Sequence, residues 1–259
     1  MISIKNPDQL AKMRSAGHLL HDVLQGAREI IRPGITTAAI NAYVDEKIRQ
    51  GGGIPTELGY MGYPASICAS IDDEVVHGIP SEAVELKEGS IISIDVTLAL
   101  DGWQADSAFT APVGQVSAEK LRLIQVTEEC FWKGARMALN GNRIGDIGST
   151  VQAHAEKNGY SAVRDLTGHG IGREMHEDPS VPNYGVPGHG PRIRPGMTFC
   201  IEPMIAMGRW QVHQLSDGWT IVTNDHKPSA HYEHTVAVTP KGLPEILTLP
   251  GAVWKEAEA

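Results

Sequence analysis

The stretch LKEGSIISID, residues 86–95, is echoed 107 residues later by IRPGMTFCIE, residues 193–202. Each segment reads aliphatic, basic, any residue and glycine, and each ends in isoleucine followed by an acid. A second pair, GAREIIRPG from residue 26 and GARMALNGN from residue 134, repeats at an offset of 108. Short matches arise by chance, but two in the same order at nearly equal offsets favour a duplicated helix–helix–strand unit.

The predicted architecture is a single α+β domain over residues 1–259, built from pseudo-repeats at about 10–112 and 117–240. The repeat aligns Asp95 with Glu202. We therefore expect the two halves to pair around one shared site, with each half contributing an acid to it.

Length and composition narrow the class of protein. The chain has 259 residues, 41% of them hydrophobic, which is enough for one well-buried core. Its net charge of −9 argues against binding to nucleic acid or to an anionic membrane surface. Three scattered cysteines give no disulfide framework, the start is polar, and no apolar run approaches 18 residues. We expect a cytoplasmic protein.

Periodicity and turn residues place the elements. Asn6-Pro7-Asp8 is typical of a helix start and Arg32-Pro33-Gly34 of a helix end. Further helices are expected over 37–49, 117–140 and 146–158, and strands over 66–71, 90–100, 197–206, 219–223 and 232–238.

The segment IDVTLALDGWQAD, residues 94–106, predicts a hairpin with a two-residue turn at Asp101-Gly102. In that register Thr97 faces Asp106, and Asp95 lies on the same face as both. Two carboxylates on one apolar face repel each other unless a cation lies between them. The alternative is a pair of surface acids near the turn.

Two more acids interrupt apolar, strand-like runs: Glu202 in TFCIEPM and Glu233 in AHYEHTV. Each alone is more often a satisfied structural acid. The segment TGHGIGREMHEDP, residues 167–179, adds His169 and His176 in what we interpret as a flexible, glycine-rich loop. These two could be surface histidines, buried core histidines or metal ligands. One imidazole with four carboxylates suits two divalent ions better than a structural zinc site, and indicates metal-assisted hydrolysis.

These segments, together with GYMGYPASICASIDDEVVHGIP at 59–80, resemble the metal-binding and substrate-pocket motifs of type I methionine aminopeptidases of the short bacterial form. The likeness covers nearly the whole chain. It implies the pita-bread fold, a duplicated α/β arrangement around a central antiparallel sheet with a dinuclear metal site. It also implies two divalent ions, among cobalt, manganese, iron and zinc, with the metal ligands Asp95, Asp106, His169, Glu202 and Glu233.

The resemblance further implies removal of N-terminal methionine when the second residue is small, by attack of a metal-bridged hydroxide on the first peptide bond. His77, His176 and Glu202 would be catalytic, with Glu202 as general base and His176 as oxyanion donor. His77 and His176 would also contact substrate, in a pocket with Tyr60, Tyr63, Cys68, Met175 and Trp219. The implied partners are nascent polypeptide N-termini at the ribosome exit, with the enzyme acting as a monomer without membrane or nucleic acid.

Two positions depart from the family pattern. Met175 stands where bacterial members often have Phe, and we expect it still to wall an apolar pocket. Glu57 stands where they often have Cys, and we expect its carboxyl to point outward. A proline-directed peptidase of the same fold and a non-catalytic relative are the alternatives. The first is disfavoured because the chain has no room for the N-terminal domain those enzymes usually carry, and the second because all five ligand positions are kept.

Overall fold

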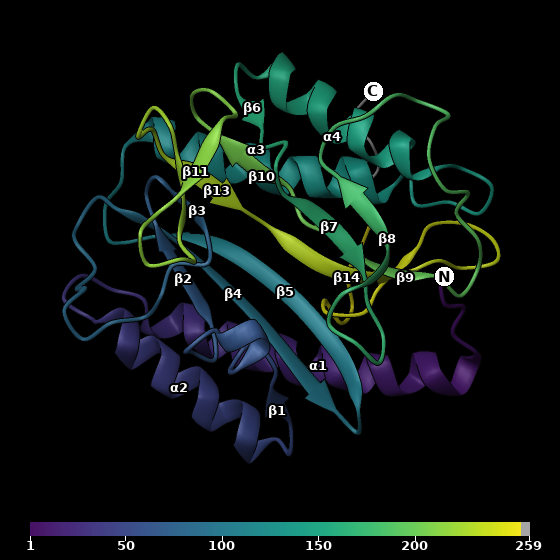
Figure 1. Cartoon of the computed structure of the whole chain (residues 1–259), viewed down its shortest axis with the longest axis horizontal. Helices are drawn as coiled ribbons and strands as arrows, with labels where there is room; N and C mark the ends of the chain where they lie inside the picture. The colour runs from purple at the N-terminus through teal and green to yellow at the C-terminus, as the bar shows by residue number, and fades with distance from the viewer. Residues whose placement is uncertain (255–259) are drawn as a thin grey trace.

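The computed structural model describes residues 1–254 and is organised around a curved antiparallel sheet (Figure 1). The strands run in the order β1-β4-β5-β14-β9-β7-β8, with β2 also paired to β4 and β15 to β14. Strands β4 and β5 from the first half and β14 and β9 from the second thus lie side by side in its middle. Two small sheets, β13-β10-β6 and β11-β12-β3, lie beside it. The strand bounds are β1 Ile54–Pro55, β2 Cys68–Ile71, β3 Glu74–Val76, β4 Ile91–Leu100, β5 Trp103–Pro112, β6 Ser161–Ala162, β7 Thr167–Gly170, β8 Glu177–Pro182, β9 Thr198–Ile201, β10 Met204–Ala206, β11 Val212–Gln214, β12 Ile221–Thr223, β13 Ser229–His231, β14 Glu233–Ala237 and β15 Glu245–Ile246.

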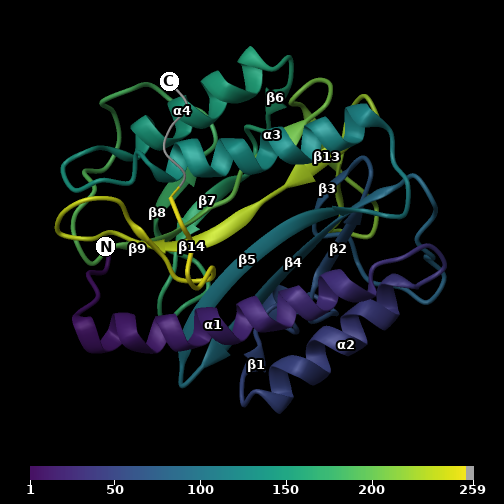
Figure 2. The same ribbon diagram turned by 180° about the vertical axis from the view of Figure 1, so that it is seen from behind.

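Four helices cover one face of this sheet, as the view from behind shows (Figure 2). They are α1 (Pro7–Ile30) with α2 (Thr37–Gln50), and α3 (Ala118–Ala135) with α4 (Ile144–Lys157). The apolar face of each pair is buried against its own part of the sheet, which makes two large core clusters. The opposite face carries loops and the short 3-10 helix η1 (Tyr60–Gly62). None of the helices in residues 1–254 is long and apolar enough to cross a membrane.

The predicted helices are present, and α1 begins with the expected cap. Asn6 accepts a hydrogen bond from the backbone N–H of Gln9 at 2.9 Å and starts α1. The helix predicted over 117–140 ends earlier, at Ala135, because Met137 and Ala138 bond to carbonyls only three residues back. Each half has the order helix, helix, strands; a duplication origin stays a prediction.

The hairpin forms in the predicted register. Thr97 pairs with Asp106 and Leu100 with Trp103 across β4 and β5. Asp101 and Gly102 have φ values of 51° and 73°, the left-handed conformation that a two-residue turn of this kind needs at both positions. The turn therefore fixes which side of the sheet Asp106 faces.

The glycine-rich segment around His169 is not a flexible loop, and that prediction was wrong. Residues Thr167–Gly170 form β7, which pairs with β8 and β9. A side chain at Gly168 would collide with the carbonyl oxygen of Cys200, and one at Gly170 with that of Asp178. These glycines allow close approach between strands rather than a turn, so His169 is held by a sheet.

Candidate metal and substrate site

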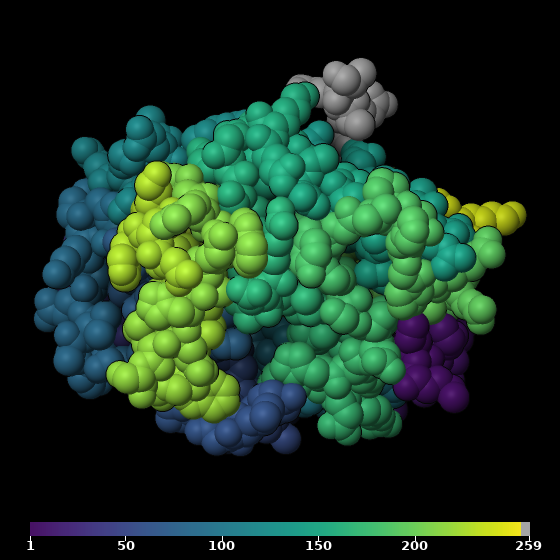
Figure 3. Space-filling view, turned by 45° about the horizontal axis from the view of Figure 1, so that its top comes forward, coloured from purple at the N-terminus to yellow at the C-terminus, as the bar shows by residue number. Residues whose placement is uncertain are grey.

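A cavity of about 390 Å³ opens on the face of the sheet that the helices leave free. In the space-filling view its mouth lies between the yellow-green segment near residues 207–220 and the green segment near 170–190 (Figure 3). The structure brings every predicted site residue into its wall: Tyr60, Tyr63, Cys68, His77, Asp95, Asp106, His169, Met175, His176, Glu202, Trp219 and Glu233. Their roles remain predictions, but their assembly in one cavity is observed.

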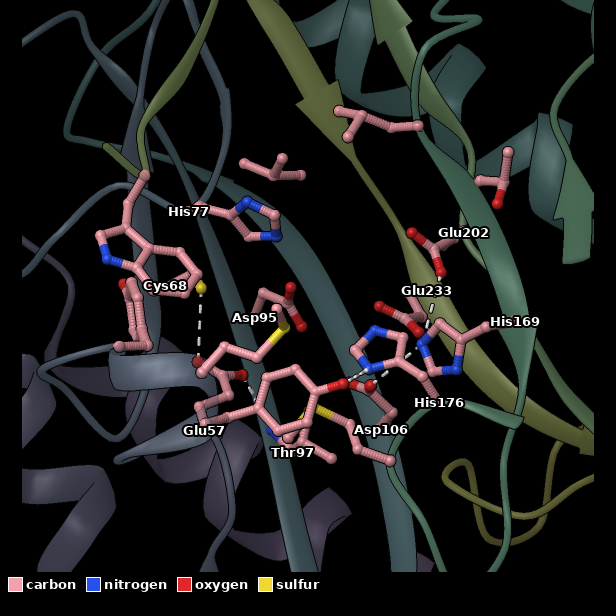
Figure 4. Close-up of a pocket in the computed structure, with 18 of the residues that line it drawn as sticks. Glu57, Cys68, His77, Asp95, Thr97, Asp106, His169, His176, Glu202 and Glu233 are labelled. Carbon is pink, nitrogen blue, oxygen red and sulfur yellow. Dashed lines mark hydrogen bonds and ion pairs between the residues drawn. The ribbon is translucent and has the colours of Figure 1, made fainter. Parts of the chain in front are cut away.

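One end of the cavity is acidic, and the strands of both halves supply it (Figure 4). Asp95 and Asp106 project from the hairpin β4–β5, and Glu233 is the first residue of β14. Glu202 follows directly after β9. The Nε2 atom of His169, on β7, lies 3.6 Å from Oδ2 of Asp106 and 3.7 Å from Oε1 of Glu202. The pairing of β5 with β14 and of β14 with β9 therefore puts the acids of the two halves together.

Several oxygens at this acidic end have no partner. Oδ1 of Asp95, Oδ1 of Asp106 and Oε1 of Glu233 are buried, and none has a hydrogen-bond partner within residues 1–254. No lysine or arginine in this range forms an ion pair with the four carboxylates. Buried acids without partners are costly, and oxygen atoms converging on one space are what a divalent cation needs. The donor set fits divalent metal ions.

The pKa values also reflect the crowding of buried carboxylates at the acidic end. Burial, and then the negative charge of Asp106, raise the pKa values of Asp95 and Glu233 well above their ordinary range. Burial raises the pKa of Glu202 to about 8, although His169 opposes the rise. Burial lowers the pKa of His169, but Asp106 and Glu202 outweigh it and raise that pKa to about 9. Without a cation, the site therefore favours holding protons.

His176 lies beside the acidic end rather than within it. Its ring centroid is 4.1 Å from that of His169, and its Nδ1 is 2.9 Å from the hydroxyl of Tyr60. Burial, and then the charge of His169, lower the pKa of His176 to about 4, so the ring is neutral at pH 7. If the Tyr60 hydroxyl donates to Nδ1, the proton of the neutral ring is on Nε2. His77 lies across the cavity, and burial lowers its pKa too.

The other end of the cavity is a largely apolar slot. The ring of Tyr63 packs edge-on against Trp219, with centroids 5.0 Å apart, and Cys68 belongs to the same buried cluster. The Tyr63 hydroxyl lies 3.1 Å from the carbonyl of Ile67 and 3.0 Å from that of Gly78, so its single hydrogen has backbone acceptors. Met175 is buried and lines the cavity, and its role as an adaptable wall of the slot stays a prediction.

Glu57 corrects a prediction, because its carboxyl points inward rather than outward. The residue is 7% exposed and lines the slot next to Cys68 (Figure 4). Oε1 accepts a hydrogen bond from the backbone N–H of Thr97 at 3.0 Å, and Oε2 accepts one from Sγ of Cys68 at 3.3 Å. Burial, and then Asp106, raise the pKa of Glu57 well above its ordinary range. These local donors are the reason that an acid can stay inside.

His231 is a buried histidine that the sequence reasoning missed. It ends β13, is 1% exposed, and lies near Asp95 and Glu233. Burial lowers its pKa to about 4. Alternation could have revealed it, since positions i and i+2 of an extended chain lie on one side and His231 precedes Glu233 by two.

Comparisons with known proteins agree with this geometry. Residues 11–240 match metallopeptidase family M24. A methionine aminopeptidase of Clostridium perfringens is 49% identical over 96% of this chain and 99% of its own length. The crystal structure of methionine aminopeptidase from Rickettsia prowazekii superposes with a TM-score of 0.94 at 44% identity, covering 96% of this chain and all of the other.

A more distant structure, the prolidase from Pyrococcus furiosus, has a TM-score of 0.77 at 19% identity and shares the fold alone. The superposed region includes 96% of this chain but 66% of the prolidase chain. The pita-bread fold expected from the resemblance is confirmed.

Proposed function

Because the chain belongs to metallopeptidase family M24 and, within it, to the methionine aminopeptidases, we propose that it removes the N-terminal methionine from proteins and peptides whose second residue is small. One observation carries this proposal: a single cavity joins an acidic end, able to hold divalent metal, to an apolar slot for one side chain. The acidic end, where the peptide bond would be hydrolysed, thus adjoins the slot that would bind the first side chain.

We assign the metal ligands as Asp95, Asp106, His169, Glu202 and Glu233, holding two divalent ions, with cobalt, manganese, iron and zinc all compatible with these donors. When bound, such ions supply an activated water and polarise the carbonyl that is attacked. The unpartnered oxygens of Asp95, Asp106 and Glu233 support this assignment. Metal analysis of protein purified without added metal would establish number and identity.

Side chains of the protein then accept the proton of the attacking water and donate hydrogen bonds to the peptide group. Glu202, in the wall of the cavity, accepts a proton from the attacking water at a carboxylate oxygen. His176 donates from Nε2–H to the oxygen of the scissile carbonyl as negative charge develops there, with Tyr60 holding the ring by its Nδ1. His77, facing the same space, hydrogen-bonds the nitrogen side of the peptide bond.

The slot selects the first residue. Tyr63, Cys68, Met175 and Trp219 enclose a narrow space that suits an unbranched, apolar side chain. Methionine gains dispersion and sulfur–aromatic contacts there, each worth about 0.3–1.5 kcal/mol. Norleucine differs little in size, so its peptides should be cleaved at a reduced rate, whereas branched or charged first residues should not fit.

A peptide series tests this function. Met-Ala-Ser, Nle-Ala-Ser, Leu-Ala-Ser and Lys-Ala-Ser vary the first position, and Met-Lys-Ser and Met-Pro-Ser vary the second. Acetylated Met-Ala-Ser is the control for a free amino terminus. We expect cleavage of the methionine peptide with a small second residue and none after acetylation. Equal rates for Met, Leu and Lys would reduce the function to a general metallopeptidase.

We further propose that the protein works as a cytoplasmic monomer on nascent chains leaving the ribosome, where new N-termini first appear. The net charge of −9 speaks against a direct contact with ribosomal RNA over a broad surface. Light scattering after gel filtration tests the monomer, and co-sedimentation with translating ribosomes tests the site of action.

A further inference from the structure

The buried imidazole of His231 makes no hydrogen bond within the described part of the chain. The side chain is 1% exposed, and neither Nδ1 nor Nε2 has a hydrogen-bond partner within residues 1–254. Leaving a buried polar atom unpaired costs about 1–3 kcal/mol, and native proteins pair nearly all such groups. The function described above gives this ring no role.

The ring lies where metal is expected. His231 and Glu233 flank Tyr232, and Nε2 of His231 is 3.6 Å from Oε2 of Glu233. His231, Asp95 and Glu233 can each offer one ligand atom so that all three lie within 4.8 Å of one another. Ligands on one ion, at about 2.0–2.2 Å from it, lie at most about 4.4 Å apart. Small side-chain movements therefore suffice to bring the three onto one ion.

Two hydrogen bonds hold the backbone of His231 in place. The N–H of His231 donates to Oγ1 of Thr110 at 2.8 Å, and the carbonyl of His231 accepts from that same hydroxyl at 2.9 Å. Thr110 is buried on β5, the strand that carries Asp106. His231 is thus tied directly to the hairpin that supplies two of the acids.

Its two neighbours also have unsatisfied atoms. Oδ1 of Asp95 and Oε1 of Glu233 are buried without partners within residues 1–254, so three side chains with missing partners lie close together. A cation would satisfy all three at once. A water molecule could also bridge these side chains, by donating to the two carboxylates and accepting from an imidazole N–H, but only a cation also offsets the two negative charges.

We propose that His231 is an additional metal ligand, which binds the same divalent ion as Asp95 and Glu233 and gives the site two imidazoles instead of one. This inference rests on the proposed metal site. Imidazole suits zinc, iron, nickel and copper, whereas an all-oxygen environment suits manganese and magnesium. His231 therefore biases the site toward the metals that prefer nitrogen.

Proton NMR of the full-length protein loaded with Co²⁺ tests the proposal directly. A paramagnetic ion shifts the exchangeable N–H proton of each imidazole that binds it far outside the normal range. Nδ1 of His169 lies 2.9 Å from the carbonyl of Gly170, which protects its proton from exchange with solvent. We expect two such resonances in the wild-type protein, from His169 and His231, and one in His231→Gln.

His176→Ala is the matched control, because His176 is close to the site but is not assigned as a ligand. Both resonances should persist in it. A wild-type spectrum with one shifted resonance would overturn the role of His231 while leaving the proposed metal site intact. A spectrum with none would overturn the metal site itself. The wild-type spectrum alone separates these outcomes, even if the variant folds poorly.

A competition titration with a metal-binding dye measures the consequence. His231→Gln should lower Zn²⁺ affinity by about 10–100-fold, and Mn²⁺ affinity by clearly less, so that the ratio of the two affinities falls. Equal losses for both metals, or none for Zn²⁺, would contradict the proposed bias. Circular dichroism of the variant checks that the fold is retained.

Discussion

The acidic end of the cavity and its apolar slot both contain buried acids, but they treat them differently. In the slot, both carboxyl oxygens of Glu57 have partners supplied by the protein, Thr97 and Cys68. At the acidic end, Asp95, Asp106 and Glu233 each keep a buried oxygen with no partner in residues 1–254. The slot is complete as folded, whereas the acidic end requires something from solution. Glu57 therefore differs from these three acids in hydrogen-bond satisfaction rather than in burial.

The largest effect should come from removing charge at the acidic end. Asp106→Asn keeps size but removes a negative charge from the centre of the cluster, so we expect metal affinity and kcat/KM each to fall by about a hundredfold or more. Dye competition and peptide hydrolysis measure the two. A variant with normal metal affinity would mean that Asp106 serves hydrogen bonding and not coordination.

Replacing His176 should separate binding from catalysis. His176→Ala removes the proposed oxyanion donor and should slow kcat by about 10²–10³-fold while leaving metal content unchanged. Tyr60→Phe, which removes the hydroxyl that holds the ring, should act in the same direction but less strongly. If His176→Ala emptied the site and His169→Ala did not, the roles of the two histidines would be reversed.

The same acid-to-amide change in the slot should have a small effect. Glu57→Gln keeps an oxygen for the N–H of Thr97 and places no new charge, so metal affinity should be retained and KM should change by a few-fold at most. Glu57→Ala instead leaves Thr97 unpaired and should lower the free energy of unfolding by about 1–3 kcal/mol. Denaturant titration and steady-state kinetics measure both. Loss of metal in Glu57→Gln would place Glu57 among the ligands.

The pH dependence of stability should reveal, with a smaller effect, the protons that the acidic end holds when no metal is bound. Glu202 and His169 have pKa values raised to about 8 and about 9 when folded, against 4.5 and 6.5 for the free groups. The folded, metal-free protein therefore holds protons that the unfolded chain has released. This stabilisation is complete below the lower values and is lost as pH rises through the higher ones.

The pH range in which Glu202 and His169 can be followed without opposing contributions from His176 and His231 lies between pH 6.5 and about 9. Below it, His176 and His231, whose pKa values are lowered to about 4, contribute with the opposite sign. Within it, the Tm of metal-free protein should fall with rising pH, and the gain in Tm on adding Mn²⁺ should grow. Calorimetry with and without metal measures this. A gain in Tm that is constant across the window would indicate that metal does not replace these protons.

Much of this site was predictable because strand geometry is regular. The turn at Asp101-Gly102 sets the register of β4 and β5, and alternation then places Asp95 and Asp106 on one face. The motif around His169 identified the residue but not its setting, because glycines that permit close strand contacts look in sequence like glycines that permit turns. Neither signal depends on contacts between distant parts of the chain.

What could not be predicted depends on such contacts. The inward position of Glu57 requires donors from Thr97 and Cys68, which lie 40 and 11 residues away. A rule that charged residues stay outside would therefore misplace it, as ours did. The isolation of His231 is likewise a property of the packed structure, since no local pattern shows which buried ring lacks a partner.

The proposed reaction depends above all on divalent metal completing the acidic end of the cavity. The most direct measurement removes metal with a chelator, quantifies what remains by mass spectrometry, and follows Met-Ala-Ser hydrolysis as Mn²⁺ or Co²⁺ is added back. We predict that activity vanishes with the metal, returns in proportion to metal bound, and saturates at two ions per chain. Full activity in metal-free protein would contradict the claim.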